Sequence, residues 1–174
     1  MNKKTLLIFD LNGVLIEKKY SPCAKNKTDE LPLGWSRVGG SIVKLRSETK
    51  ELFDYLFSEE GKTKYDIALW TSAYEANLLK TIHALFPKLE DQFVFRWGQE
   101  KCDWRLNPEW KSSDETPDVK PKFFWKCLTS VWREYNYDPN NTLIYDDNAQ
   151  KLERNPERCN RVIIDVASVS GDLI

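Results

Sequence analysis

The chain has 174 residues, which suits one compact domain over residues 1–174 with a core of its own. Its 26 basic and 27 acidic side chains give a net charge of -1, which argues against a protein drawn to nucleic acid or to an anionic membrane by its overall charge. No apolar run approaches the roughly 20 residues of a membrane span, and the chain begins with a strand pattern rather than a signal peptide. We therefore expect a cytoplasmic or nuclear protein with no membrane partner, and we expect a monomer.

The cysteines show no metal-binding pattern. They are far apart, and they form neither a Cys-x-x-Cys pair nor a ligand spacing with the single histidine, His83. Reduced, structural thiols are expected at all of these positions, which are Cys23, Cys102, Cys127 and Cys159.

The amino-terminal half of the chain alternates between strand and helix patterns. Residues 6–9 form a continuous apolar run that leads into a glycine turn, which predicts a buried strand. Residues 18–40 are polar and carry prolines and glycines, which predicts a long loop that can include a small hairpin. A helix is predicted from Ser47, as its N-cap, to Gly61, and a buried strand is predicted over residues 65–70.

The carboxy-terminal half continues this alternation. Apolar residues at helical spacing predict a helix that ends before Pro87, and alternation over residues 93–97 predicts a strand. Residues 98–120 indicate a loop or insertion, and a helix is predicted over residues 124–132. Strands alternating with helices predict an α/β, Rossmann-like fold, in which helices cover both faces of a parallel sheet and ligands bind beyond the carboxyl ends of its strands. The last two strands of this sheet are predicted at residues 142–145 and 161–165.

Acidic residues follow two of the predicted strands. Asp10 follows the first strand, and Asp146 and Asp147 follow the strand at residues 142–145. Because the carboxyl ends of parallel strands meet at one edge, these carboxylates are expected to cluster, and oxygen donors without a nearby thiolate or imidazole favour Mg2+. Each acidic residue alone is also explained as a helix cap or turn former, but a metal site explains the set better.

Polar side chains at the same edge suit a phosphoryl group. Thr71 and Ser72 follow the strand at residues 65–70, where hydroxyl and backbone donors at a helix start can bind phosphoryl oxygens. Thr71 is alternatively a simple helix N-cap. Lys126, on the helix predicted before the Asp146 strand, can bring a positive charge to this edge, whereas an isolated helix lysine is usually solvated.

Four ordered segments resemble the four motifs of haloacid dehalogenase phosphatases, and they lie at residues 9–15, 69–73, 126–129 and 143–148. More narrowly, the chain resembles the branch that contains the small phosphatases of the RNA polymerase II carboxy-terminal domain, also called NLI-interacting-factor-like. The resemblance extends from residue 6 to residue 165 and implies small loop insertions without a large cap domain. The features typical of that branch are residues 43–46, residues 93–96 with Cys102 shortly after them, and Asn155-Pro156.

The resemblance implies a role for each candidate residue. Asp10 would be the nucleophile that becomes an aspartyl-phosphate, Thr71 would hold the phosphoryl group, and Lys126 would neutralise the developing charge. Lys120 and Lys122 are alternative candidates for the lysine role. The implied metal ligands are Asp10, the backbone carbonyl of Asn12, Asp146 and, directly or through water, Asp147.

One position departs from the pattern of that branch. Its phosphatases usually carry a second aspartate two residues after the nucleophile, and the present chain has Asn12 there. An amide cannot titrate, so it cannot serve as general acid and base, and the expected loss is on the order of 10²–10⁴-fold if nothing replaces it. Three accounts remain open: a phosphatase with modest rates, a phosphate-binding scaffold without turnover, and an engineered replacement of a native aspartate.

We predict a Mg2+-dependent phosphatase with impaired turnover that acts on phosphoserine or phosphothreonine in a phosphoprotein or phosphopeptide. A weak or inactive phosphate-binding scaffold or interaction module is the alternative function. A nucleic-acid 3′-phosphatase is disfavoured by the near-neutral charge. The loops at residues 18–40 and 98–120 can form the walls of a peptide groove, although ordinary packing equally explains the tryptophans near them, which are Trp97, Trp104 and Trp110.

Overall fold

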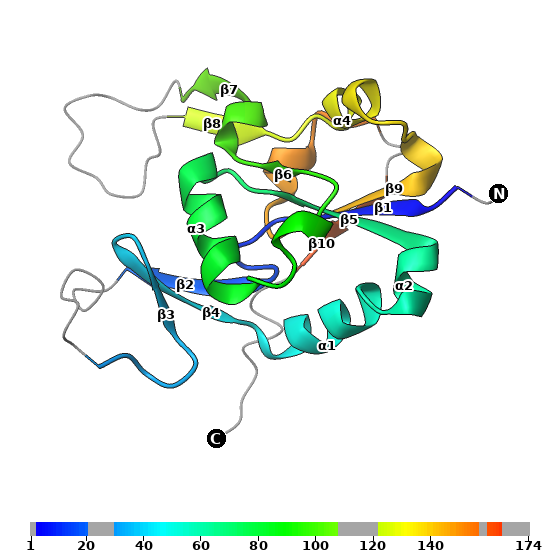
Figure 1. Ribbon diagram of the computed structural model, residues 1–174. Coiled ribbons are helices and arrows are strands. Elements are labelled where there is room, and N and C mark those ends of the chain that lie inside the picture. The colour runs from blue at the N-terminus through cyan, green and yellow to red at the C-terminus, as the bar shows by residue number, and fades with distance from the viewer. Residues whose placement is uncertain (1–2, 21–29, 108–121, 157–159, 165–174) are drawn as a thin grey trace.

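The computed structural model describes residues 3–20, 30–107, 122–156 and 160–164. Its centre is a five-stranded sheet in the order β10-β9-β1-β5-β6, in which every neighbouring pair is parallel (Figure 1). The predicted α/β, Rossmann-like parallel sheet is therefore confirmed. Its strands are β1 (Thr5–Phe9), β5 (Tyr65–Trp70), β6 (Arg96–Trp97), β9 (Thr142–Asp146) and β10 (Asn160–Ile163).

Two hydrophobic layers cover the two faces of this sheet because side chains alternate along each strand. Leu7 of β1 belongs to one layer, which includes buried residues of α1 (Ser47–Leu56) and α3 (Glu75–Leu85). Ile8 belongs to the other layer, which includes buried residues of α4 (Leu128–Glu134). The prediction of helices on both faces is therefore confirmed.

The boundary between the first two helices differs from the prediction. Ser47 is the first residue of α1 rather than its N-cap, and α1 ends at Leu56. Gly61 lies inside a second, short helix, α2 (Glu59–Lys64), instead of ending the first. A Cβ on Gly61 would collide with the carbonyl oxygen of Tyr55, so the glycine allows the two helices to approach closely.

Short 3-10 helices join the larger elements, and they are η2 (Glu90–Gln92), η3 (Gln99–Lys101), η4 (Pro139–Asn141) and η5 (Ala149–Leu152). None of the helices in the described ranges is long and apolar enough to cross a membrane.

The cysteines in the described ranges are free thiols. Cys102 is buried as a free thiol, and its burial raises the pKa to about 11, which suits a structural role. Cys127 is a half-buried free thiol, whereas Cys23 and Cys159 lie outside the described residues.

An antiparallel sheet of three strands is inserted between β1 and α1. Its order is β2-β4-β3, with β2 (Ile16–Tyr20), β4 (Ser41–Leu45) and β3 (Ser36–Val38). The loop predicted over residues 18–40 therefore contains strand at both ends, and residues 21–29 lie outside the described part. β2 could not be predicted from the sequence because three of its five side chains are exposed and no apolar alternation marks it.

A hairpin pairs β7 (Asp103–Leu106) with β8 (Lys122–Trp125) in antiparallel fashion. The helix predicted over residues 124–132 is therefore wrong at its start, because its first two residues belong to β8 and α4 begins only after them. Arg105 of β7 lies over the Phe123 ring of β8, and this cation–aromatic contact supports the strand pairing.

The aromatic segment before this hairpin forms a shorter strand than predicted, because only β6 is a regular strand there. Trp97 of β6 is buried and packs on Phe95, with ring centroids 4.3 Å apart, so packing accounts for it. Trp104 is exposed on β7, and Trp110 lies outside the described residues.

Candidate active site at the carboxyl edge of the sheet

The register of the central sheet brings polar side chains to one edge. The last residue of β1 is paired with Leu69 of β5 and with Tyr145 of β9. Asp10 continues this ladder, since its N–H donates to the carbonyl oxygen of Tyr145 at 2.9 Å. Asp10, Thr71 and Asp146 consequently follow neighbouring strands at the same edge, and all three are buried. The expected convergence of these residues is confirmed.

Lys126 joins this cluster from the segment between β8 and α4, not from a helix as predicted. Its Nζ lies 2.9 Å from Oδ1 of Asp10 and 2.5 Å from Oδ2 of Asp146. The side chains of Lys126 and Asp146 have no exposed surface, and Asp10 is 3% exposed. A lysine is almost never buried this completely unless it is paired, so the two carboxylates explain its position.

Lys151 of η5 brings a second ammonium group that the sequence reasoning missed. Its Nζ lies 3.4 Å from Asp10, 3.0 Å from Asp146 and 3.2 Å from Asp147. One signal was available, because Asp147 and Lys151 are four residues apart, the spacing of a local ion pair. Three carboxylates therefore meet two ammonium groups, and one negative charge remains uncompensated within the cluster.

Burial and charge act in opposite directions on these groups. Burial alone would raise the pKa of Asp146, but the ammonium groups of Lys126 and Lys151 outweigh it and hold this pKa below its ordinary value. For Asp147 burial is the stronger influence, and the pKa of its carboxyl is raised despite Lys151. Burial would lower the pKa of Lys151, yet the carboxylates of Asp10 and its neighbours hold that pKa above its ordinary value. Lys151 is therefore charged at neutral pH.

The three carboxylates fit a divalent cation. One oxygen from each of Asp10, Asp146 and Asp147 can be chosen so that all lie within 4.8 Å of one another. A set of carboxylate oxygens suits a hard cation such as Mg2+. Gly13 makes the close approach possible: its φ is +84°, and a Cβ there would lie 2.5 Å from Oδ2 of Asp147.

Thr71 and Ser72 follow β5 at the same edge. The hydroxyl of Thr71 accepts a hydrogen bond from the N–H of Ala73 at 3.2 Å, and Ser72 is half-buried. The N-cap residue of α3 is Tyr74, so the alternative in which Thr71 simply caps the helix is wrong. Thr71 is therefore a buried hydroxyl in the turn between β5 and α3, at the edge where the carboxylates lie.

Asn12 lies in the turn after β1, where it forms an isolated β-bridge with Ile16. Its side chain is exposed and, with Thr71, lines a hollow of about 100 Å³ between the inserted sheet and α3. Asn12 is therefore placed where it can contact a group that enters the hollow.

Asn155 holds the Lys126 segment in place. Its Nδ2 donates to the carbonyl oxygen of Lys126 at 2.7 Å, and its Oδ1 accepts from the N–H of Leu128 at the same distance. The N–H of Lys126 in turn donates to the carbonyl oxygen of Lys151 at 2.8 Å. The two lysines are thus fixed to one another through the main chain, and the Asn155 of the predicted motif has a structural explanation.

The alternative lysines for the Lys126 position differ from it. Lys122 lies at the start of β8, with its Nζ 3.8 Å from the centroid of the Trp104 ring, and the described residues give it no contact with the acidic cluster. Lys120 lies outside the described residues. Among the described candidates, Lys126 is the lysine that contacts Asp10.

Two solved structures share this fold. The fission yeast RNA polymerase II CTD phosphatase Fcp1 bound to beryllium fluoride has 15% sequence identity and a TM-score of 0.54, over 92% of this chain and 41% of that chain. A structure of Fcp1 described as an essential RNA polymerase II CTD phosphatase gives the same values. The chain thus spans about 41% of the length of the Fcp1 chains it matches. No curated protein sequence matches it.

The family comparison covers most of the chain. The model described as NLI interacting factor-like phosphatase matches residues 5–165, which include the whole acidic cluster and both of its lysines. The resemblance stated from the motifs is therefore confirmed. The chain belongs to the NLI interacting factor-like phosphatase family.

Proposed function

We propose that this chain is a Mg2+-dependent phosphatase that forms an aspartyl-phosphate on Asp10 and acts on phosphoserine or phosphothreonine in a protein. The observation that carries the proposal is the buried ammonium group of Lys126, which contacts both Asp10 and Asp146. We propose that residues 1–174 act as one domain and as a monomer, in the cytoplasm or the nucleus.

The proposed reaction begins at the Asp10 carboxylate. One of its oxygens attacks phosphorus while the bond to the substrate oxygen breaks, and water then hydrolyses the aspartyl-phosphate to inorganic phosphate. Thr71 and Ser72 would donate hydrogen bonds to the phosphoryl oxygens, and Lys126 would offset their charge. When bound, Mg2+ would supply further positive charge to the phosphoryl group. The residues proposed to hold it are Asp10, Asn12 through its carbonyl, Asp146 and Asp147.

Asn12 limits this reaction in a specific way. The departing oxygen needs a proton and the attacking water must lose one, and an amide can do neither. Leaving groups that are stable as anions need no such proton. We therefore expect turnover of aryl phosphates to exceed turnover of alkyl phosphates by a wide margin.

A hollow lined by candidate site residues supports a protein substrate. It is lined by Asn12 and Thr71, and its other walls come from the inserted sheet and α3. The structurally similar Fcp1 chains are described as phosphatases of the RNA polymerase II CTD, which is a protein substrate. A phosphorylated side chain can enter such a site while the rest of its peptide stays outside.

Turnover of an aryl phosphate with Mg2+ tests the proposal. We expect weak activity that Asp10→Asn abolishes and that Asn12→Asp raises by a factor on the order of 10²–10⁴. Lys62→Met, on α2 and exposed, serves as a control that keeps the starting rate. If Asn12→Asp is as inactive as the starting protein, the idea that an intact site lacks only its general acid is wrong.

A phosphate-binding module is the second candidate, and Asn12 favours it because that residue leaves binding groups in place while removing the acid and base. Calorimetry with a phosphopeptide and Mg2+ separates the two functions. Binding without release of inorganic phosphate over days supports the module, whereas release that Asp10→Asn abolishes supports the phosphatase.

A further inference from the structure

Lys18 of β2 is a cation at the hollow that Asn12 and Thr71 of the proposed active site line. Side chains of β2 point alternately to the two faces of the inserted sheet, so Glu17 and Lys19 lie on the face opposite Lys18. Both have partners there: Glu17 pairs with Lys44 at 3.2 Å, and the Nζ of Lys19 lies 5.1 Å from the centroid of the Trp35 ring. Lys18 is exposed and lines the hollow together with Asn12 and Thr71. Within the described part of the chain it has neither an ion-pair nor a hydrogen-bond partner.

The hollow suits a side chain rather than a whole small molecule. Its volume of about 100 Å³ is well below the roughly 300–1,000 Å³ of ordinary ligand pockets. Val43, directly across from Lys18 in the sheet, gives it an apolar wall, while Asn77 and Thr81 of α3 give it polar groups. A residue next to a phosphorylated one can therefore place a short polar or charged side chain here.

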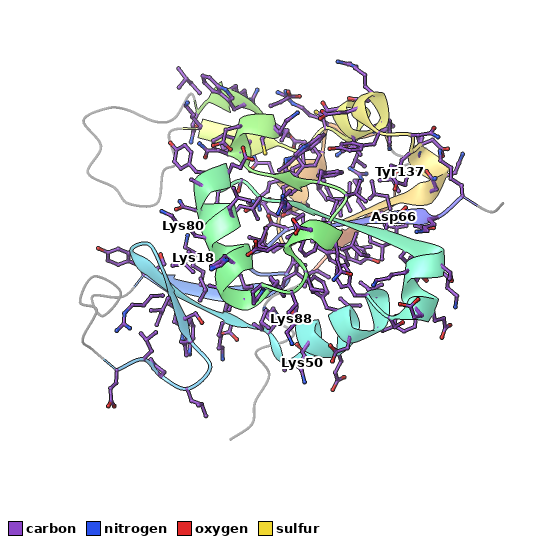
Figure 2. The ribbon with its side chains drawn as sticks, viewed as in Figure 1. Lys18, Lys50, Asp66, Lys80, Lys88 and Tyr137 are labelled. Atoms are coloured by element: carbon purple, nitrogen blue, oxygen red, sulfur yellow. The ribbon has the colours of Figure 1, made fainter. Side chains whose placement is uncertain are left out.

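A second exposed lysine lies past this hollow. Val38 lines both the hollow and a wider cleft, in which Lys80 of α3 lies. Lys80 is exposed and, among the described residues, has no ion-pair partner. Figure 2 shows Lys18 and Lys80 beside α3, whereas Lys50 projects from α1, well away from them in that view. The wider cleft also has the carboxylates of Glu90 and Asp91 in its lining, whereas Lys18 is the one charged residue among the described ones that line the hollow.

We propose that this site selects phosphoresidues with an acidic neighbour, with Lys18 as the specificity-determining residue and Lys80 as a second contact. The inference rests on the proposed function, since it assigns the peptide that surrounds the phosphoryl group. An unpaired ammonium group attracts a carboxylate and repels a lysine or arginine of the substrate. The attraction is local, because salt screens exposed charges beyond about 8 Å at physiological ionic strength.

A phosphopeptide series in which Asp, Ala or Lys occupies each of the three positions on either side of phosphoserine tests this inference. For one position, we expect kcat/KM for Asp over Ala to be about twofold to fivefold, the range for one exposed ion pair. Lys18→Met should bring the ratio close to one, and Lys18→Glu should make the Lys peptide the better substrate. Lys50→Met removes an exposed lysine of α1 and should leave the ratio unchanged.

The outcomes separate this inference from the proposed function. If phosphopeptides are hydrolysed but the starting protein does not distinguish Asp from Ala at any position, or Lys18→Met keeps the preference, the inference is wrong and the phosphatase stands. If nothing is hydrolysed, the proposed function fails. Fluorescence anisotropy of the same labelled peptides then decides: tighter binding of an Asp peptide that Lys18→Glu reverses supports the inference, and equal binding of all peptides overturns it.

Discussion

The two ends of β1 carry ion pairs of opposite character. At the amino end, Lys4 lies 3.2 Å from Asp66, and their side chains are 42% and 28% exposed. The hydroxyl of Tyr137 also donates to Asp66, at 2.7 Å, and Figure 2 labels these two residues at the same place. At the carboxyl end, Asp10 and Lys126 form a pair of similar length that is almost completely buried.

This difference separates structural from functional charge. Exposed ion pairs contribute about 0–1 kcal/mol, so the one at the amino end serves ordinary surface packing. Buried pairs lose hydration that their attraction barely recovers, and an apolar replacement is often as stable. Clustered, buried and strongly paired charges like those at the carboxyl end of β1 are typical of active sites, which supports the proposed reaction there.

The largest effect is expected when the buried cluster loses a cation. Lys126→Met leaves Asp10 and Asp146 with Lys151 alone, and we expect the free energy of unfolding to fall by about 3–5 kcal/mol. Lys4→Met, the same change at the amino end of the strand, should lower it by less than about 1 kcal/mol. Urea unfolding of both variants measures the difference. Equal losses would falsify the distinction between the two ends.

Mg2+ should stabilise the folded protein through the carboxylates at the carboxyl end of β1, and not through Asp66 at its amino end. At a concentration 100 times its dissociation constant, a ligand that binds only the folded state adds about 2.7 kcal/mol to the free energy of unfolding. Asp147→Asn should weaken this response because it removes one of the clustered carboxylates. Asp66→Asn removes a carboxylate from the opposite end and should keep the full response. Unfolding curves with and without Mg2+ provide the measurement, and a lost response in Asp66→Asn would contradict the assigned site.

Asn155→Ala should have an intermediate effect. It removes the hydrogen bonds to the carbonyl oxygen of Lys126 and the N–H of Leu128, both at buried positions, at about 1–3 kcal/mol of unfolding free energy. Because the ammonium group itself remains, turnover of aryl phosphate should fall less than in Lys126→Met. Asn140→Ala, which removes an exposed amide from η4, is the control, and a loss as large as that of Asn155→Ala would rule out a special role for the Asn155 hydrogen bonds.

The smallest effect is expected in the pH dependence of the free energy of unfolding, and it differs between the two ends of β1. The pKa of Asp146 is lowered in the fold, so its contribution is complete above the ordinary carboxyl range and is lost as pH falls through the folded pKa. Burial and the bond to Asp66 raise the pKa of Tyr137, so the fold loses stability as pH rises above about 10. Tyr137→Phe should flatten the alkaline loss and leave the acid loss intact. A pH series of unfolding midpoints shows whether the two losses are separable.

The central strands could be predicted from the sequence because the signal lies in their own residues. β1 and β5 contain the continuous apolar runs at residues 6–9 and 67–70, and the residues of both runs are buried. Placing Asp10 and Asp146 at one edge then needed only the rule that parallel strands end on the same side. The fold and the acidic cluster follow from local pattern plus one rule of topology.

The inserted strands and the second lysine depend on partners that are distant in sequence. The aromatic residues of β8 also fit the spacing of the helix after it, and only pairing with β7, beyond residues 108–121, makes them a strand. Lys151 gave one local signal, its spacing from Asp147, but such pairs are common on solvated helices. Its contacts with Asp10 exist only after the sheet has formed, so no local pattern could reveal them.

The long separation between the members of the buried cluster has a consequence for biosynthesis. Asp10 and Lys126 are 116 positions apart, and Asp10 and Lys151 are 141 positions apart. Contacts that close such long loops carry a large entropy loss and form late in folding. The acidic end of β1 therefore leaves the ribosome long before either lysine that will neutralise it. The complete cluster, and with it the reaction proposed for it, therefore requires a chain that has folded through Lys151, and partly made chains do not carry it.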